Sequence, residues 1–187
     1  MTSRQQAGTL LVAVGLIRAH LGAAFDVLGQ NRVLDLDPAD QAVVDEVRQK
    51  LPDQPIGDLV AVNTYLVSHV VAALTLALHT KDPDDLTTWL DKRVAALTQG
   101  GGDLVEIEAA ELTRAYVPEL KPGVDPDASA ASKILARTDG TELAIYLAEF
   151  SARMYASAFG PGGLEQAQAA LLSFVKPPSS GNHAPRS

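Results

Sequence analysis

The chain has 187 residues, with 15 Lys and Arg against 23 Asp and Glu, which gives a formal net charge of −8. This balance argues against nucleic-acid binding, because proteins that bind a phosphate backbone concentrate basic residues on one face. The sequence has no cysteine, which excludes disulfides, thiolate metal sites and cysteine nucleophiles. The length predicts one domain with a substantial core. We expect the protein to be cytoplasmic.

Residues 5–28 are predicted to form the first helix, which ends at Gly29. Gly8, Gly15 and Gly22 recur every seven residues and would lie along one side of it. Each interior glycine costs about 0.5–1 kcal/mol relative to alanine, so a row of them needs a physical reason. One reason is close approach by another helix, in this chain or in a second copy. The alternative is chance in a sequence rich in alanine and glycine.

Asp-Pro pairs mark three further helix starts, because aspartate caps a helix and proline fits its first position. They lie at residues 37, 82 and 125, spaced by 45 and 43 residues, which would suit an α-solenoid. The three units share almost no other side chains, so a capping role alone is the favoured interpretation. After the first helix we expect helices over about 37–51, 58–79, 82–97, 104–116, 125–137, 142–159 and 164–175.

The segment 58–79 is the predicted central helix, because it is apolar on most sides. Its apolar face would contain Leu59, Val60, Leu66, Val67, Val70, Val71, Leu74 and Leu78. The narrow opposite strip would contain Asp58, Ala61, Tyr65, Ser68, His69, Ala72 and His79. His69 is therefore expected at the surface or at its rim.

Asn63 interrupts the apolar face of this predicted helix. A buried amide needs hydrogen-bond partners, since leaving it unpaired costs roughly 1–3 kcal/mol. We therefore expect Asn63 either to fix the helix register through a polar contact or to line a cavity. In the second case Asn63, Tyr65 and His69 would be the ligand-binding residues.

The central segment is also long enough to span a bilayer. Asn63 and His69 lie inside it, and no aromatic belt or basic cluster flanks it, so a buried core helix is favoured over a membrane span. We expect the protein not to be membrane-bound.

Residue patterns that would carry chemistry are few. The four histidines form no metal-ligand pair with each other or with glutamates, and neither a metal nor a cofactor is expected. Glu142, Tyr146, Glu149 and Arg153 share one stripe of the 142–159 helix, which is typical of a solvated face. A Ser-His-Asp triad assembled in space has no fixed spacing, so an enzyme with such a site stays an alternative.

These patterns together predict an all-α protein, an irregular or orthogonal bundle of about seven helices around the buried 58–79 helix. A helical domain over 1–176 would precede a disordered tail over 177–187. For function they favour a non-enzymatic protein-interaction or accessory subunit, with a protein partner or self-association through the Gly8, Gly15 and Gly22 face. The alternatives are a small-molecule-binding helical domain with a cavity near Asn63, an enzyme with an unrecognised helical site, and a membrane-inserted protein.

Overall fold

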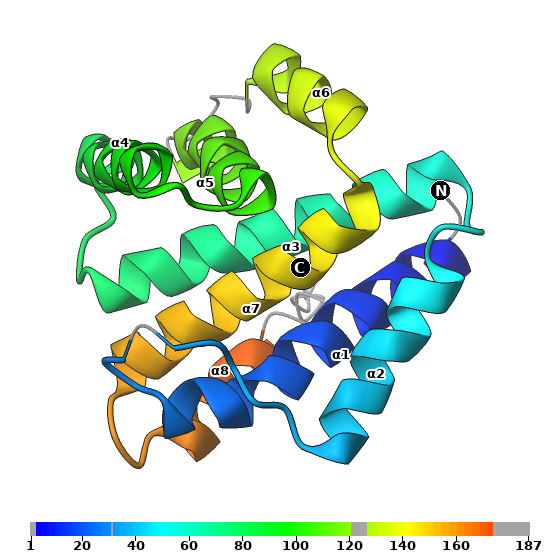
Figure 1. Ribbon diagram of the computed structural model, residues 1–187, viewed down its shortest axis with the longest axis horizontal. Coiled ribbons are helices and arrows are strands. Elements are labelled where there is room, and N and C mark those ends of the chain that lie inside the picture. The colour runs from blue at the N-terminus through cyan, green and yellow to red at the C-terminus, as the bar shows by residue number, and fades with distance from the viewer. Residues whose placement is uncertain (1–2, 31, 121–126, 174–187) are drawn as a thin grey trace, which may run out of the picture.

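The computed structural model describes residues 3–30, 32–120 and 127–173. This part of the chain is all-α, as predicted, with no strand (Figure 1). It forms α1 (Ser3–Asp26), α2 (Pro38–Lys50), α3 (Ile56–Ala77), α4 (Pro83–Gly100), α5 (Leu104–Tyr116), the 3-10 helix η1 (Val117–Leu120), α6 (Ala128–Arg137), α7 (Gly140–Phe159) and α8 (Leu164–Ser173). The predicted tail over 177–187 lies outside the described residues.

Aspartates start most of these helices, because a carboxylate accepts the backbone N–H groups that the first turn leaves unpaired. The Asp37 carboxylate accepts from the backbone N–H groups of Ala39 and Asp40, at 2.8 and 2.9 Å. The other caps are Asp82 on α4, Asp103 on α5, Asp127 on α6 and Asp139 on α7. The capping role predicted for Asp37 and Asp82 is confirmed, whereas Asp125 and Pro126 lie outside the described residues.

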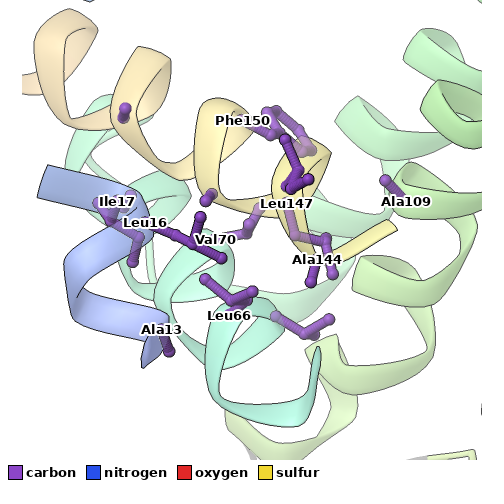
Figure 2. Packing of buried hydrophobic residues seen from close by; sticks show 14 of the residues in the cluster. Ala13, Leu16, Ile17, Leu66, Val70, Ala109, Ala144, Leu147 and Phe150 are labelled. Atoms are coloured by element: carbon purple, nitrogen blue, oxygen red, sulfur yellow. The ribbon is translucent and has the colours of Figure 1, made fainter. Parts of the chain in front are cut away.

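The centre of the bundle is the pair α3 and α7, which cross in the middle of Figure 1. α1 packs against both of them, α5 covers the other side, and α8 packs against α1 and α7. In Figure 2, Leu16 of α1 and Val70 of α3 lie together beneath Leu147 of α7. Because α1 packs against helices from the far end of the chain, the arrangement differs from an α-solenoid, in which each repeat contacts only its neighbours.

The prediction of a buried central helix is confirmed, since Leu66, Val67 and Val70 of α3 are fully buried. The predicted burial is wrong at two positions of α3. Val60 was expected in the core but is exposed, and His69 was expected at the surface or rim but is 3% exposed. α7 and α5 cover α3 from two sides, so its buried surface is wider than one apolar stripe.

α6 lies at the edge of the bundle, at the top of Figure 1, and is attached mainly to α5. The attachment centres on Glu108, a fully buried carboxylate of α5. The Arg137 guanidinium donates to it at 2.6 Å and also to Glu111 at 2.8 Å, and the Thr138 hydroxyl donates to it as well. The buried charge of Glu108 is thereby paired by the end of α6.

Candidate functional site: an apolar groove between the first two helices

The outward side of α1 is unusual for a helix at a protein surface. Surface helices normally present charged or polar residues to water. Here the successive outward positions Gly8, Leu11 and Gly15 carry no charge, and the Leu11 side chain is 68% exposed. The charged residues on this side are Arg4, one turn before Gly8, and Arg18, one turn after Gly15. Gly8 and Gly15 therefore lie on a partly exposed surface that carries no charge between them.

This surface forms one wall of a groove of about 560 Å³ between α1 and α2. Its lining is largely apolar, and Val62 of α3 also contributes to it. The α2 wall consists of Val43, Val47 and Leu51 with Glu46 and Lys50, and the α1 wall consists of Gly8, Thr9, Leu11, Val12 and Gly15.

The glycines leave this groove open. A Cβ atom built on Gly8, Gly15 or Gly22 would meet no atom within 4 Å, beyond the chain neighbours and the helix's own backbone. One predicted reason for the glycine row was close approach by another helix of this chain. That prediction is wrong. Gly8 and Gly15 line the groove, whereas Gly22 lies beyond it. Contact with a second chain stays a prediction.

The charged rim of the groove is nearly neutral. Lys50 donates to Glu46 at 2.5 Å within α2, and this hydrogen bond lowers the pKa of the Glu46 carboxyl. Asp58 is the remaining charged residue of the lining. A partner that enters the groove would therefore meet mostly apolar surface, the ion pair of Glu46 with Lys50, and the Asp58 carboxylate.

Asn63 serves the contact between α3 and α7. Its side-chain Nδ2 donates to the Gly140 carbonyl at 2.9 Å and to the Leu59 carbonyl at 3.0 Å, and the residue is fully buried. A Cβ atom on Gly140 would lie 2.6 Å from Leu59 Cδ2, so the two helices approach closely at this point. This polar contact is the arrangement that the register interpretation predicted.

Tyr65 and His69, the other two predicted ligand-binding residues, have surroundings that differ from those of Asn63. Tyr65 is partly buried and packs against the hydrophobic core, whereas His69 is buried two turns along α3. The His69 Nδ1 lies 3.4 Å from the Tyr155 hydroxyl of α7. Burial lowers the pKa of His69 to about 4 and raises that of Tyr155, so both groups are neutral near pH 7.

The predicted stripe of α7, which consists of Glu142, Tyr146, Glu149 and Arg153, lines a hollow of about 620 Å³. The other walls of this hollow are α2, the segment that precedes α2, and the start of α5. Arg48 of α2 donates to both carboxylate oxygens of Glu142, at 2.7 and 3.2 Å. Arg153 donates to Glu149 and to the backbone carbonyl of Arg32. The interpretation as a plain solvated face was therefore incomplete, because these charges join α7 to two other segments.

Tyr146 also lines this hollow and connects it to an aromatic contact that sequence patterns did not indicate. The Arg93 guanidinium donates to the Tyr146 hydroxyl at 3.0 Å and lies 4.7 Å from the centre of the Phe150 ring. These partners come from α4 and α7, so only the tertiary fold brings them together. Burial is the main cause that raises the pKa of Tyr146.

Comparison with protein-family models, with curated proteins and with solved structures found no match.

Two helices, over Gly8–Asp26 and Ile56–Ala77, are long and apolar enough to cross a membrane by length and composition. About half of each span is buried inside the bundle, at 56% and 50%. Core helices of soluble proteins meet the same criterion, so this is weak evidence about membranes. Within the described ranges, no three His, Asp or Glu side chains gather in a way that could hold a metal ion.

Proposed function

We propose that this protein is a non-enzymatic interaction or accessory subunit, and that the groove between α1 and α2 is its contact surface. One observation carries the proposal: Leu11 is 68% exposed between two glycines, on an uncharged helix face that borders an apolar groove. Contact with water makes such a surface unfavourable, and apolar patches of this kind are typical of protein interaction sites.

The shape of the groove suits a helical partner. Gly8 and Gly15 lie two turns apart on α1, which is about 10 Å along the helix axis. An amphipathic helix docks into such a groove through apolar residues spaced by three and four positions. The glycines would let the backbone of that partner come close to α1, because no side chain occupies the space above them.

A site-specific photo-crosslinking experiment tests this proposal. A photoreactive amino acid replaces Leu11 in one variant and Leu172 in a control, since Leu172 is a similarly exposed leucine (58%) on α8, outside the groove lining. In extract of the source cells, we expect protein crosslinks at position 11 in clear excess over position 172. Equal crosslinking at the two positions would contradict the proposal.

A further inference from the structure

We infer that α6 is a displaceable helix, and that the face of α5 beneath it is a binding surface for an arginine-bearing amphipathic helix of another protein. This covered face consists of Glu108, Glu111, Leu112 and Ala115, which lie at positions i, i+3, i+4 and i+7 of one helix face. In the structure α6 occupies it, so a partner gains access only when α6 is released. The inference does not use the α1–α2 groove, and its failure would leave the proposed function standing.

Two contacts show that α6 runs antiparallel along the covered face. Where α6 starts, the Asp127 backbone N–H donates to the Ala115 carbonyl at 2.9 Å. Where α6 ends, the Arg137 guanidinium donates to Glu108 at 2.6 Å and to Glu111 at 2.8 Å. The middle of α6 therefore lies over the stretch of α5 between these two contacts.

Little apolar contact holds α6 in this place. Of its ten residues, Ala131 and Ile134 are buried, and its main contact is with α5. α8 also has ten residues, but it packs against both α1 and α7. Because a small apolar contact offsets little of the conformational entropy that an ordered helix loses, α6 belongs to the part of the fold that opens most easily.

The buried carboxylate of Glu108 makes this contact a polar one. Its side chain is fully buried, and its donors Arg137 and Thr138 both come from the end of α6. Arg137 itself is 53% exposed, so water competes for its donors. Buried ion pairs are often less stabilising than apolar side chains of the same size. Such a pair suits a specific contact that can open better than a permanent attachment.

The helices on either side of α6 are held in place without it. α5 packs against α3, α4 and α7, and its end continues into η1, in which Val117 is fully buried. The Asp139 carboxylate caps the start of α7, and the Gly140 carbonyl accepts from Asn63. Release of α6 would therefore leave the rest of the bundle intact.

The covered face defines the chemistry of its partner. It combines apolar side chains with two carboxylates less than one turn apart. α6 matches this surface through Ala131, Ile134 and Arg137, which follow one another at intervals of three. A helix with the same spacing of a small residue, a large apolar residue and an arginine would make the same contacts. Arginine is favoured over lysine, because one planar guanidinium donates to both carboxylates.

A peptide added in trans tests this inference. The probe is a fluorescent peptide of residues 127–138. It is mixed with the full-length wild type, with Ile134→Asp, which places a charge at the buried contact of α6, or with Lys133→Asp, which changes an exposed residue of the same helix. In wild type and Lys133→Asp, α6 competes at an effective concentration of about 1 mM. Fluorescence anisotropy should show at least tenfold tighter binding to Ile134→Asp than to the other two chains.

Variants of the peptide test the predicted chemistry. Arg137→Glu in the peptide should weaken its binding to the Ile134→Asp chain at least tenfold, because it places a third carboxylate beside two others. Arg137→Lys should weaken it at least threefold, since an ammonium lacks the planar fork of donors. Ser132→Ala is the control, because Ser132 is exposed on α6, and it should change the affinity less than twofold.

Hydrogen exchange of the wild-type chain gives a readout that needs no substitution. We expect the amides of 128–137 to exchange through a local opening, at least tenfold faster than the buried amides of α3 and α7. Exchange of α6 only together with α3 and α7 would overturn the inference, because α6 would then be an integral part of the bundle. Loss of the folded far-UV circular dichroism signal in Ile134→Asp would lead to the same conclusion.

The binding experiment has two further outcomes that would overturn the inference. Equal affinity of the peptide for all three chains, or no binding to Ile134→Asp at about 1 mM, would show that the covered face is not a separate binding surface. A wild-type dimer in sedimentation that Ile134→Asp converts to monomer would show that α6 of a second copy, rather than a helix of another protein, occupies the face.

Discussion

The Asn63 side-chain amide donates to the Gly140 backbone carbonyl at 2.9 Å, across 77 positions of the chain. The bond links the first half of α3 to the first residue of α7, the two helices at the centre of the bundle. A single polar group that is buried between apolar helices can fix their relative position, because other registers leave it unpaired.

Loss of this hydrogen bond should destabilise the fold. Asn63→Leu keeps a similar volume but leaves the Gly140 carbonyl buried without this donor. We expect the free energy of unfolding in urea to fall by about 2 kcal/mol. Ser68→Ala is the control, because Ser68 is exposed on the same helix and its hydroxyl donates to the Thr64 carbonyl within that helix. That change should stay within about 0.5 kcal/mol, and an equal loss in both variants would contradict a register role.

The close approach at Gly140 predicts a steric effect. In Gly140→Ala the new methyl group would lie 2.6 Å from Leu59 Cδ2, so the Leu59 side chain must move. We expect thermal and urea unfolding to show a loss of about 1 kcal/mol. Gly57→Ala in the first turn of α3 has open space and should be neutral or slightly stabilising.

A second substitution, at Leu59, tests whether this close contact causes the loss of stability in Gly140→Ala. Leu59→Ala removes the atoms that the new methyl group would meet, so the double variant should lose less than the sum of its two single changes. Strict additivity would show that the close contact is not the origin of the effect.

Buried His69 should make stability depend on pH. Its pKa is lowered from 6.5 to about 4, so between these pH values the unfolded state binds a proton that the folded state does not. Stability is therefore fully present above pH 6.5, falls as the pH drops toward 4, and levels off below that. The two pKa values correspond to a loss of roughly 3 kcal/mol.

Urea unfolding at several pH values, with wild type and His69→Gln, measures this contribution. The difference between the two proteins should show the predicted loss between pH 6.5 and 4. Burial rather than the contact with Tyr155 causes the lowered pKa, so Tyr155→Phe should retain the pH dependence. An identical pH profile for wild type and His69→Gln would show that His69 does not titrate in this way.

Arg137→Ala should loosen α6. The substitution removes one donor from the buried carboxylate of Glu108 and one from Glu111. An inadequately paired buried charge costs about 1–3 kcal/mol, and the cost should fall on the element that supplied the donor. We expect faster amide hydrogen exchange over 128–137, with the protection of α3 and α7 unchanged.

The double variant Glu108→Leu with Arg137→Ala provides the matched comparison. Replacement of the buried carboxylate removes the need for a donor, so stability should recover much of what Arg137→Ala loses. Uniformly faster exchange across all helices would contradict a local role for this contact.

Local rules made the helix starts predictable from sequence, because a cap depends only on the residues beside it. The caps at Asp37 and Asp82 can be recognised from two or three neighbouring residues. The all-α class follows from the same patterns. The core position of α3 was predictable as well, since few other places in a fold suit a helix that is apolar on most sides.

The failures concern contacts between distant segments. His69 was misplaced because its covering residue, Tyr155, lies 86 positions away on α7. The salt bridge of Arg48 with Glu142 joins positions 94 apart in the chain. In the sequence of α7 alone, the stripe that contains Glu142 therefore cannot be distinguished from a solvated face. The Leu11 groove depends on where α2 lies beside α1, which no short pattern specifies.

The packing of α1 on α7 and α8 has a consequence for biosynthesis. A ribosome adds about 5–20 residues per second, so α1 exists for roughly ten seconds before α7 has been made. During that interval the part of α1 that packs against α7 and α8 lacks its cover on the nascent chain, and chaperones can bind it. The topology thus makes late translation, rather than early folding of the first helix, the step that completes the core.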